Sequence, residues 1–201
     1  MKKAVLITGR IHPGESHASY ILEGFISFLL SDDPSAVALR SSFIFYIIPM
    51  LNPDGVVAGN FRTSFSGKDL NRQFNRLNKH VFPEITSLHD FALHLKANYR
   101  SKLHFYFDFH SHASKRGLFC YGPEHHPGST DFFRSRALAK LIEQKTPVFS
   151  YGKSIFTVSE AKKATGRAHM LWKIKIPMTF TFEVSNGLFE TKCTRNNPFS
   201  Q

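Results

Sequence analysis

The stretch AVLITGRIHPGESHASYILEGFISFLL, residues 4–30, decides the fold. It opens with a short continuous apolar run that ends at Gly9, which is typical of a buried strand. A helix follows, because large apolar residues then recur every three or four positions: Ile21, Leu22, Phe25, Phe28 and Leu29. A buried strand joined through a polar turn to an amphipathic helix predicts one βα unit of a parallel sheet.

The alternation continues along the chain. SDDPS, residues 31–35, ends the first helix, and residues 52–71 read as a long polar loop. Strands are expected over 42–49, 103–110, 117–122 and 177–184, and helices over 83–96, 131–145 and 166–173. Such alternation predicts an α/β fold with a mixed, largely parallel sheet and helices on both faces.

The size and composition fit one folded domain over residues 1–201. Hydrophobic residues make up 42% of the chain, including 21 Phe, which excludes a disordered protein. No stretch approaches the roughly 18 apolar residues of a membrane span, and the N-terminal run is too short for a signal peptide. Cys120 and Cys193 show no metal-binding spacing and fit a reducing compartment. We therefore expect a soluble, cytoplasmic protein.

The charge balance favours an acidic partner. Lys and Arg number 26 against 15 Asp and Glu, which gives a formal net charge of +11. On composition alone, nucleic acid ranks first among acidic partners, ahead of an anionic membrane surface or a polyacidic protein segment.

Polar clusters follow four of the predicted strands. These are RIHPGE (10–15), NPDG (52–55), HSH (110–112) and Glu183 in the last strand. Sites of open α/β sheets lie at the carboxyl ends of the strands, so the four clusters predict a single pocket.

His12 and Glu15 form the first candidate metal pair. Zinc favours His nitrogen and carboxylate oxygen, and Pro13 and Gly14 make a turn that lets the two side chains converge. Taken alone, the same pattern also describes a loop His followed by a Glu in the first turn of a helix. His110 or His112, which share one side of an extended chain, could supply a third ligand.

Two further groups of residues suit catalysis. Asp69, Asn71 and Arg72 lie in one loop, where Arg can grip a carboxylate with two hydrogen bonds and Asn can add another. Taken singly, Arg72 and Arg62 are better interpreted as surface residues. Glu183 lies in an apolar strand, where a carboxylate is costly to bury unless it has a role such as general base, or unless the strand is an exposed edge.

Five motifs in this order resemble the zinc carboxypeptidase family. They are HPGES (12–16), PMLNPDGVVAGNFRTSFSGKDLNRQF (49–74), DFHSHASKRGLFCYG (108–122), ATGRA (164–168) and TFTFEVSNG (179–187). The similarity is strongest to the cytosolic carboxypeptidases, which trim glutamates from tubulin tails, and HASKRG followed by CYG is most like the members that remove branch-point glutamates.

The resemblance implies a metal centre and its immediate partners. Carried over position by position, it makes His12, Glu15 and His110 the ligands of one zinc ion and His112 a neighbour. Asp69 matches the carboxylate that orients the first ligand His. Glu183 matches the general base and acid.

The resemblance also implies how substrate binds. Arg62 matches the residue that stabilises the oxyanion, and Asn71 and Arg72 match the pair that holds the terminal carboxylate. Arg167 falls where the family reads the terminal side chain, and a cation there would select Glu or Asp. The implied substrate is an acidic protein tail such as polyglutamylated tubulin, in the cytoplasm or on the cytoskeleton, with neither nucleic acid nor membrane as partner.

Some family features are not matched. We expect an incomplete catalytic domain, truncated at both ends and without the N-terminal β-sandwich domain of the cytosolic members. The substrate-capping Tyr has no clear counterpart, and Tyr151 is a candidate by position only. Two alternatives therefore stand beside the peptidase: a zinc hydrolase of acyl-amino acids with the same metal site, and a non-catalytic module that binds acidic tails.

Overall fold

The computed structural model describes residues 2–98 and 103–185. Cys193 and residues 186–187 of the last motif lie outside the described residues. The elements follow in this order: β1 (Lys3–Gly9), α1 (His17–Leu30), α2 (Pro34–Ser42), β2 (Phe43–Ile48), α3 (Pro53–Val57), η1 (Leu70–Arg72), α4 (Pro83–Asn98), β3 (Leu103–His112), β4 (Leu118–Tyr121), α5 (Thr130–Lys145), η2 (Glu160–Lys162), α6 (Gly166–Trp172) and β5 (Met178–Ser185).

The strands form one mixed sheet in the order β2-β1-β3-β5-β4. The pairs β1–β2, β1–β3 and β3–β5 are parallel, and β4 pairs antiparallel with β5. The predicted mixed, largely parallel sheet is confirmed.

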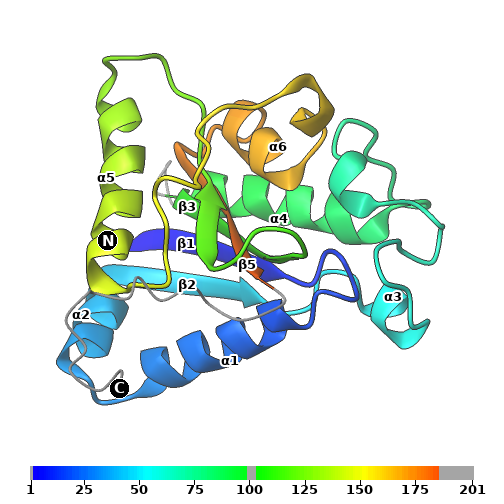
Figure 1. Ribbon diagram of the computed structural model, residues 1–201. Helices are drawn as coiled ribbons and strands as arrows, with labels where there is room; N and C mark the ends of the chain where they lie inside the picture. The colour runs from blue at the N-terminus through cyan, green and yellow to red at the C-terminus, as the bar shows by residue number, and fades with distance from the viewer. Residues whose placement is uncertain (1, 99–102, 186–201) are drawn as a thin grey trace.

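Helices cover both faces of this sheet (Figure 1). On one face, Leu22 of α1 packs with Ile7 of β1. On the other, Leu88 of α4 and Met170 of α6 pack with Leu6 of β1. Neighbouring residues of β1 therefore enter opposite cores, as the period of two in a strand requires, and β1 is buried on both of its faces. Among the described residues, no helix combines the length and apolar character needed to cross a bilayer.

Two short helices were missed in the sequence. SDDPS does end α1, but it also starts α2, because the Asp33 side chain accepts a hydrogen bond from the Ser35 backbone N–H at 2.7 Å and Pro34 occupies the first turn. Asn52 and Pro53 start α3 in the same way, inside the segment expected to be a loop. An acceptor side chain followed by Pro is a helix-start signal, which outweighed the turn signal here.

The connections around β1 and β3 create the site. The chain leaves β1 through α1, on one face, and reaches β3 through α4, on the other face, while β2 and β3 flank β1 on opposite sides. Such a change of direction opens a crevice at the carboxyl ends of the two strands. RIHPGE follows β1 and HSH ends β3, so the topology brings both motifs to this crevice.

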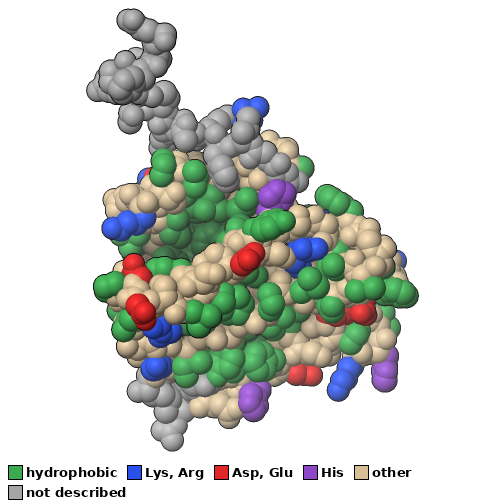
Figure 2. Space-filling model, turned by 90° about the horizontal axis from the view of Figure 1, so that it is seen from below, with side chains coloured by type: hydrophobic (Ala, Val, Ile, Leu, Met, Phe, Trp, Pro, Cys, Tyr) green, Lys and Arg blue, Asp and Glu red, His purple; other side chains and the backbone are tan. Residues whose placement is uncertain are grey.

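The face that carries α1 and α5 is apolar and hollow. A cavity of about 470 Å³ lies there, lined by hydrophobic side chains that include Phe25, Phe107, Phe109, Leu138 and Ile142. Figure 2 views the molecule from this side and shows hydrophobic side chains in the hollow. The polar groups of the predicted site lie on the other face, at the carboxyl ends of the strands.

Candidate metal centre and active site

The turn after β1 brings His12 and Glu15 together. His12 Nδ1 lies 2.7 Å from Glu15 Oε1. Gly14 makes this turn possible, because it donates its backbone N–H to Phe61 O at 2.8 Å and a Cβ there would meet the Phe61 ring at 2.5 Å. Arg10 stabilises the turn with a hydrogen bond from its Nε to Pro13 O at 2.8 Å.

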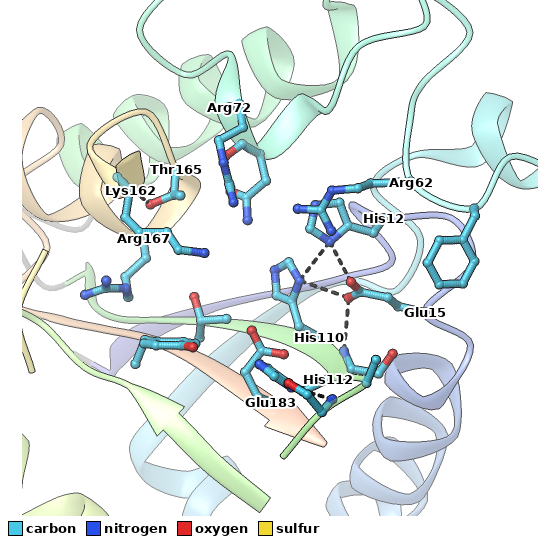
Figure 3. A pocket seen from close by; sticks show the side chains of 17 residues that line it. His12, Glu15, Arg62, Arg72, His110, His112, Lys162, Thr165, Arg167 and Glu183 are labelled. Atoms are coloured by element: carbon cyan, nitrogen blue, oxygen red, sulfur yellow. Dashed lines mark hydrogen bonds and ion pairs between the residues drawn. The ribbon is translucent and has the colours of Figure 1, made fainter. Parts of the chain in front are cut away.

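His110 completes a triangle with this pair (Figure 3). Its Nδ1 lies 3.0 Å from Glu15 Oε2 and 3.2 Å from His12 Nδ1. The three side chains are the group of possible metal ligands found among the described residues, with donor atoms within 4.8 Å of one another. All three residues are buried, at 4%, 7% and 2% exposure for His12, Glu15 and His110.

Carboxylates hold the outer nitrogens of both imidazoles. Asp69 Oδ1 lies 3.1 Å from His12 Nε2, and Asp108 Oδ2 lies 2.8 Å from His110 Nε2. Asp108 is fully buried and accepts a second hydrogen bond from Thr8 Oγ1 at 2.7 Å. Both rings are thereby oriented with Nδ1 toward Glu15, and their outer N–H groups are satisfied.

The electrostatics of this cluster favour positive charge. Burial opposes ionisation of Glu15, but hydrogen bonds from His110 and His12 outweigh it and hold the pKa of Glu15 well below its ordinary value. Burial likewise opposes a charged His110, yet Asp108 and then Glu15 raise its pKa well above the ordinary value. A cation bound between the imidazoles would replace the proton that the carboxylates attract.

Asp69 links the metal-ligand turn to the basic loop. Besides His12, it accepts hydrogen bonds from the backbone N–H of Asn71 at 2.9 Å and from Arg62 Nε at 2.9 Å. Burial raises its pKa, but His12, Arg62 and Arg72 outweigh this and lower the pKa to about 2. Asp69 therefore stays ionised and positions both η1 and Arg62.

Asn71, Arg72 and Arg167 line one pocket with the metal-ligand cluster, and this pocket has a volume of about 250 Å³. Asn71 Oδ1 accepts a hydrogen bond from the Gly166 backbone N–H at 2.9 Å, which ties the basic loop to α6. Arg72 donates to Asn71 O at 2.8 Å. The pocket is thus closed by segments that lie about a hundred residues apart in the chain.

Glu183 lies beside His110 in the register of β3 and β5 and faces the same pocket. The open alternative of an exposed edge strand is wrong, because β5 is an interior strand between β3 and β4. Burial raises the pKa of Glu183 to about 7, although His110 and His12 act in the opposite direction.

A family model described as zinc carboxypeptidase matches residues 1–192. The chain belongs to this family. Among curated relatives, it is 38% identical to cytosolic carboxypeptidase 2 of Xenopus tropicalis over 187 residues, which cover 92% of this chain and 19% of the relative. It is 36% identical to cytosolic carboxypeptidase 3 of Mus musculus over 188 residues, with 92% and 18% covered.

Solved structures agree with this membership. The metallo-carboxypeptidase of Burkholderia cenocepacia superposes with a TM-score of 0.79 at 27% identity, covering 92% of this chain and 48% of that one. The chain therefore spans about a fifth of the length of the curated relatives and about half of this solved carboxypeptidase.

The residues present fit the zinc that the zinc carboxypeptidase family implies. Two imidazole nitrogens and one carboxylate are the usual three protein ligands of a catalytic zinc. The cluster is buried, its outer nitrogens are held by carboxylates, and it opens into the pocket that Glu183 faces.

His112 is the neighbour of the metal-ligand cluster that the resemblance implies, whereas Tyr151 lies away from the pocket. His112 lines the pocket but is not in the metal-ligand cluster, because its Nδ1 accepts backbone N–H groups of Ser114 and Lys115, both at 3.1 Å. Tyr151 does not line the pocket; it packs against Phe156, with Lys140 Nζ 4.3 Å from its ring centroid. The position-based match for Tyr151 is wrong for this structure.

Several residues of this zinc carboxypeptidase site were missed in the sequence. Asp108 could have been found, because DFH places it two residues before His110 on the same side of a strand. Asn52, fully buried, donates to Ile11 O at 3.1 Å and so supports the turn of His12. Lys162 and Tyr121 line the pocket, and nothing in the sequence distinguishes them from surface residues.

Proposed function

We propose that this chain carries the catalytic centre of a zinc-dependent carboxypeptidase that removes C-terminal or branching glutamates from acidic protein tails, such as polyglutamylated tubulin. The observation that supports the proposal best is the positive charge of the pocket. Next to the metal-ligand cluster and Glu183, the pocket is lined by four cationic side chains: Arg62, Arg72, Lys162 and Arg167.

His12, Glu15 and His110 would hold one zinc ion, which would supply a Lewis acid that lowers the pKa of water in the pocket. Glu183 takes a proton from the attacking water and returns it to the leaving amine. Its raised pKa suits a group that must both accept and donate near neutral pH.

The arginines place the substrate and stabilise charge. Arg72, together with Asn71, holds the α-carboxylate of the terminal residue. Arg62 stabilises the negative charge that develops on the carbonyl oxygen, and Asp69 keeps its guanidinium in place through an ion pair of 2.8 Å. Arg167 adds positive charge to the wall that meets the terminal side chain, which favours Glu.

The net charge of +11 supports an acidic protein as partner, because an anionic tail would be steered toward the molecule. The curated relatives are named cytosolic carboxypeptidases, which supports a location in the cytoplasm. Association with the cytoskeleton follows only if tubulin is the substrate.

A substrate panel tests the proposal. The zinc-loaded protein should cleave a peptide ending in Glu, and one carrying a branched glutamate, faster than peptides ending in Leu or Lys. Arg167→Ala should reduce this preference, because it removes a buried positive charge from the wall that meets the terminal side chain. Arg72→Ala should instead weaken every substrate.

Other outcomes of this panel have clear meanings. A preference for Leu or Lys would retain the carboxypeptidase and reject the removal of glutamate. Cleavage of a small N-acylglutamate, with no cleavage of any peptide in the panel, would favour the acyl-amino-acid hydrolase. Salt-dependent binding of acidic peptides with no turnover would favour the non-catalytic module.

The carboxylates behind the imidazoles give a second prediction. Asp108→Asn should lower zinc affinity about 10- to 100-fold, because outer-shell partners orient the ligand and raise its basicity. A chelator competition titration measures this effect. Asp131→Asn in the first turn of α5, away from the pocket, is the matched control and should leave the affinity unchanged. Equal affinities for the wild type and both variants would reject the role of Asp108.

A further inference from the structure

Two cations face one aromatic ring in the wall of the pocket. Lys162 Nζ lies 5.7 Å and Arg167 Cζ 5.9 Å from the centroid of Tyr121. Tyr121 itself pairs with Thr181, two residues before Glu183 on β5. This part of the wall therefore lies within the substrate pocket and is strongly positive.

The guanidinium of Arg167 is buried and is hydrogen-bonded to the protein backbone. The residue is 3% exposed and donates hydrogen bonds to Gly122 O and, at 3.4 Å, to Thr157 O. Burial lowers its pKa to about 10, so it keeps its charge near neutral pH. Arg167 thus builds the wall and contributes its charge to the pocket, while both of its terminal nitrogens already donate to backbone carbonyls.

Lys162 differs in each respect. Its side chain is half-buried, and within residues 2–98 and 103–185 its Nζ makes no hydrogen bond or ion pair. Its backbone is held in place, because the N–H donates to Ser159 O at 2.8 Å and the carbonyl accepts from Thr165 Oγ1 at 2.7 Å. Figure 3 shows its amino group pointing into the pocket, while the guanidinium of Arg167 lies along the wall.

The charged groups around Lys162 favour the binding of an anion next to its ammonium group. Burial, and then repulsion from Arg72, Arg62 and Arg167, lower its pKa, and only Glu183 among the named neighbours acts in the opposite direction. An ammonium with three unused donors in such a place is best satisfied by a carboxylate from a ligand.

We infer that Lys162 is a specificity-determining residue whose ammonium binds the side-chain carboxylate of an acidic terminal residue. The inference rests on the proposed function, and it adds a direct contact that Arg167 alone does not provide. Arg72 takes the α-carboxylate, and Lys162 takes the side-chain carboxylate. Arg167 fixes the wall through its hydrogen bonds to Gly122 O and Thr157 O.

The neighbouring lysine supplies a matched control. Lys163 is exposed and forms an ion pair of 2.6 Å with Glu160, and it does not line the pocket. Lys162→Met and Lys163→Met therefore remove the same charge from adjacent positions, and only the first removes it from the pocket.

The experiment compares two peptides that differ only in a terminal Glu or Gln, which have nearly the same shape. In the zinc-loaded protein, Lys162→Met should lower kcat/KM for the Glu peptide about 10- to 100-fold, the range expected for a hydrogen bond to a charged group. The Gln peptide should change less than about threefold. Lys162→Arg should restore part of the preference, and Lys163→Met should match the wild type.

The same variants are also titrated with both peptides by calorimetry, so that binding is measured apart from turnover. A wild type that cleaves neither peptide would reject the proposed function, while weaker binding of only the Glu peptide by Lys162→Met would still support the role of Lys162. An unchanged ratio between Glu and Gln in both measurements overturns it. An equal loss for the two peptides also overturns it, because Lys162 would then act on a group that both share.

Discussion

Glu183→Gln should leave zinc bound and reduce turnover about 100- to 10,000-fold, the usual cost of losing a general acid–base group. The amide has almost the same shape as the carboxylate, but it cannot accept a proton from the attacking water. Glu183 faces the pocket beside His110 without belonging to the metal-ligand cluster, so its substitution should spare the metal. Peptide hydrolysis is measured together with zinc content by elemental analysis.

Glu23→Gln is the control for this prediction. Glu23 lies exposed on α1 and does not line the pocket. It should keep the wild-type rate. A near-normal rate for Glu183→Gln, with zinc retained, would show that another group removes the proton.

His12→Ala and His110→Ala should each lose zinc during purification in buffer without added metal. Loss of a group that only hydrogen-bonds to a ligand imidazole costs about 10- to 100-fold in metal affinity. Loss of a ligand itself should therefore cost more than about 100-fold. The wild-type protein should retain one zinc per chain, as measured by elemental analysis after gel filtration. Circular dichroism should confirm that each variant is folded.

His112→Ala is the matched control, because it removes an imidazole from the same strand and the same pocket. It should keep zinc, since its Nδ1 is occupied by backbone N–H groups. Undiminished zinc in both His12→Ala and His110→Ala would reject the ligand set, and loss of zinc only in His112→Ala would reassign it.

Much of the fold could be predicted because hydrophobic periodicity is a local property. The buried runs of β1, β3 and β5 and the apolar stripe of α1 are visible in the residues themselves, and their alternation requires a layered α/β domain. The short helices α2 and α3 were missed because their start signals, Asp33-Pro34 and Asn52-Pro53, overlap with signals for turns.

The candidate site also has features that local sequence predicts and features that depend on contacts between distant residues. The turn of His12 and Glu15 is local, and so is the loop from Asp69 to Arg72, which Asp69 starts by accepting the N–H of Asn71. Short motifs of this kind, together with their order, were enough to indicate the family. They could not show that Asp69 reaches His12, which lies 57 residues away.

The sequence by itself determined the α/β architecture, the candidate metal ligands and the basic character of the protein, because each depends on residue type and short-range spacing. The family motifs had already favoured His110 over His112, and the structure places His110 in the metal-ligand cluster. Only the tertiary structure decided that Lys162 and not Lys163 enters the pocket, because backbone hydrogen bonds turn the Lys162 side chain inward. That choice also depends on packing between segments far apart in the chain, so no local pattern records it.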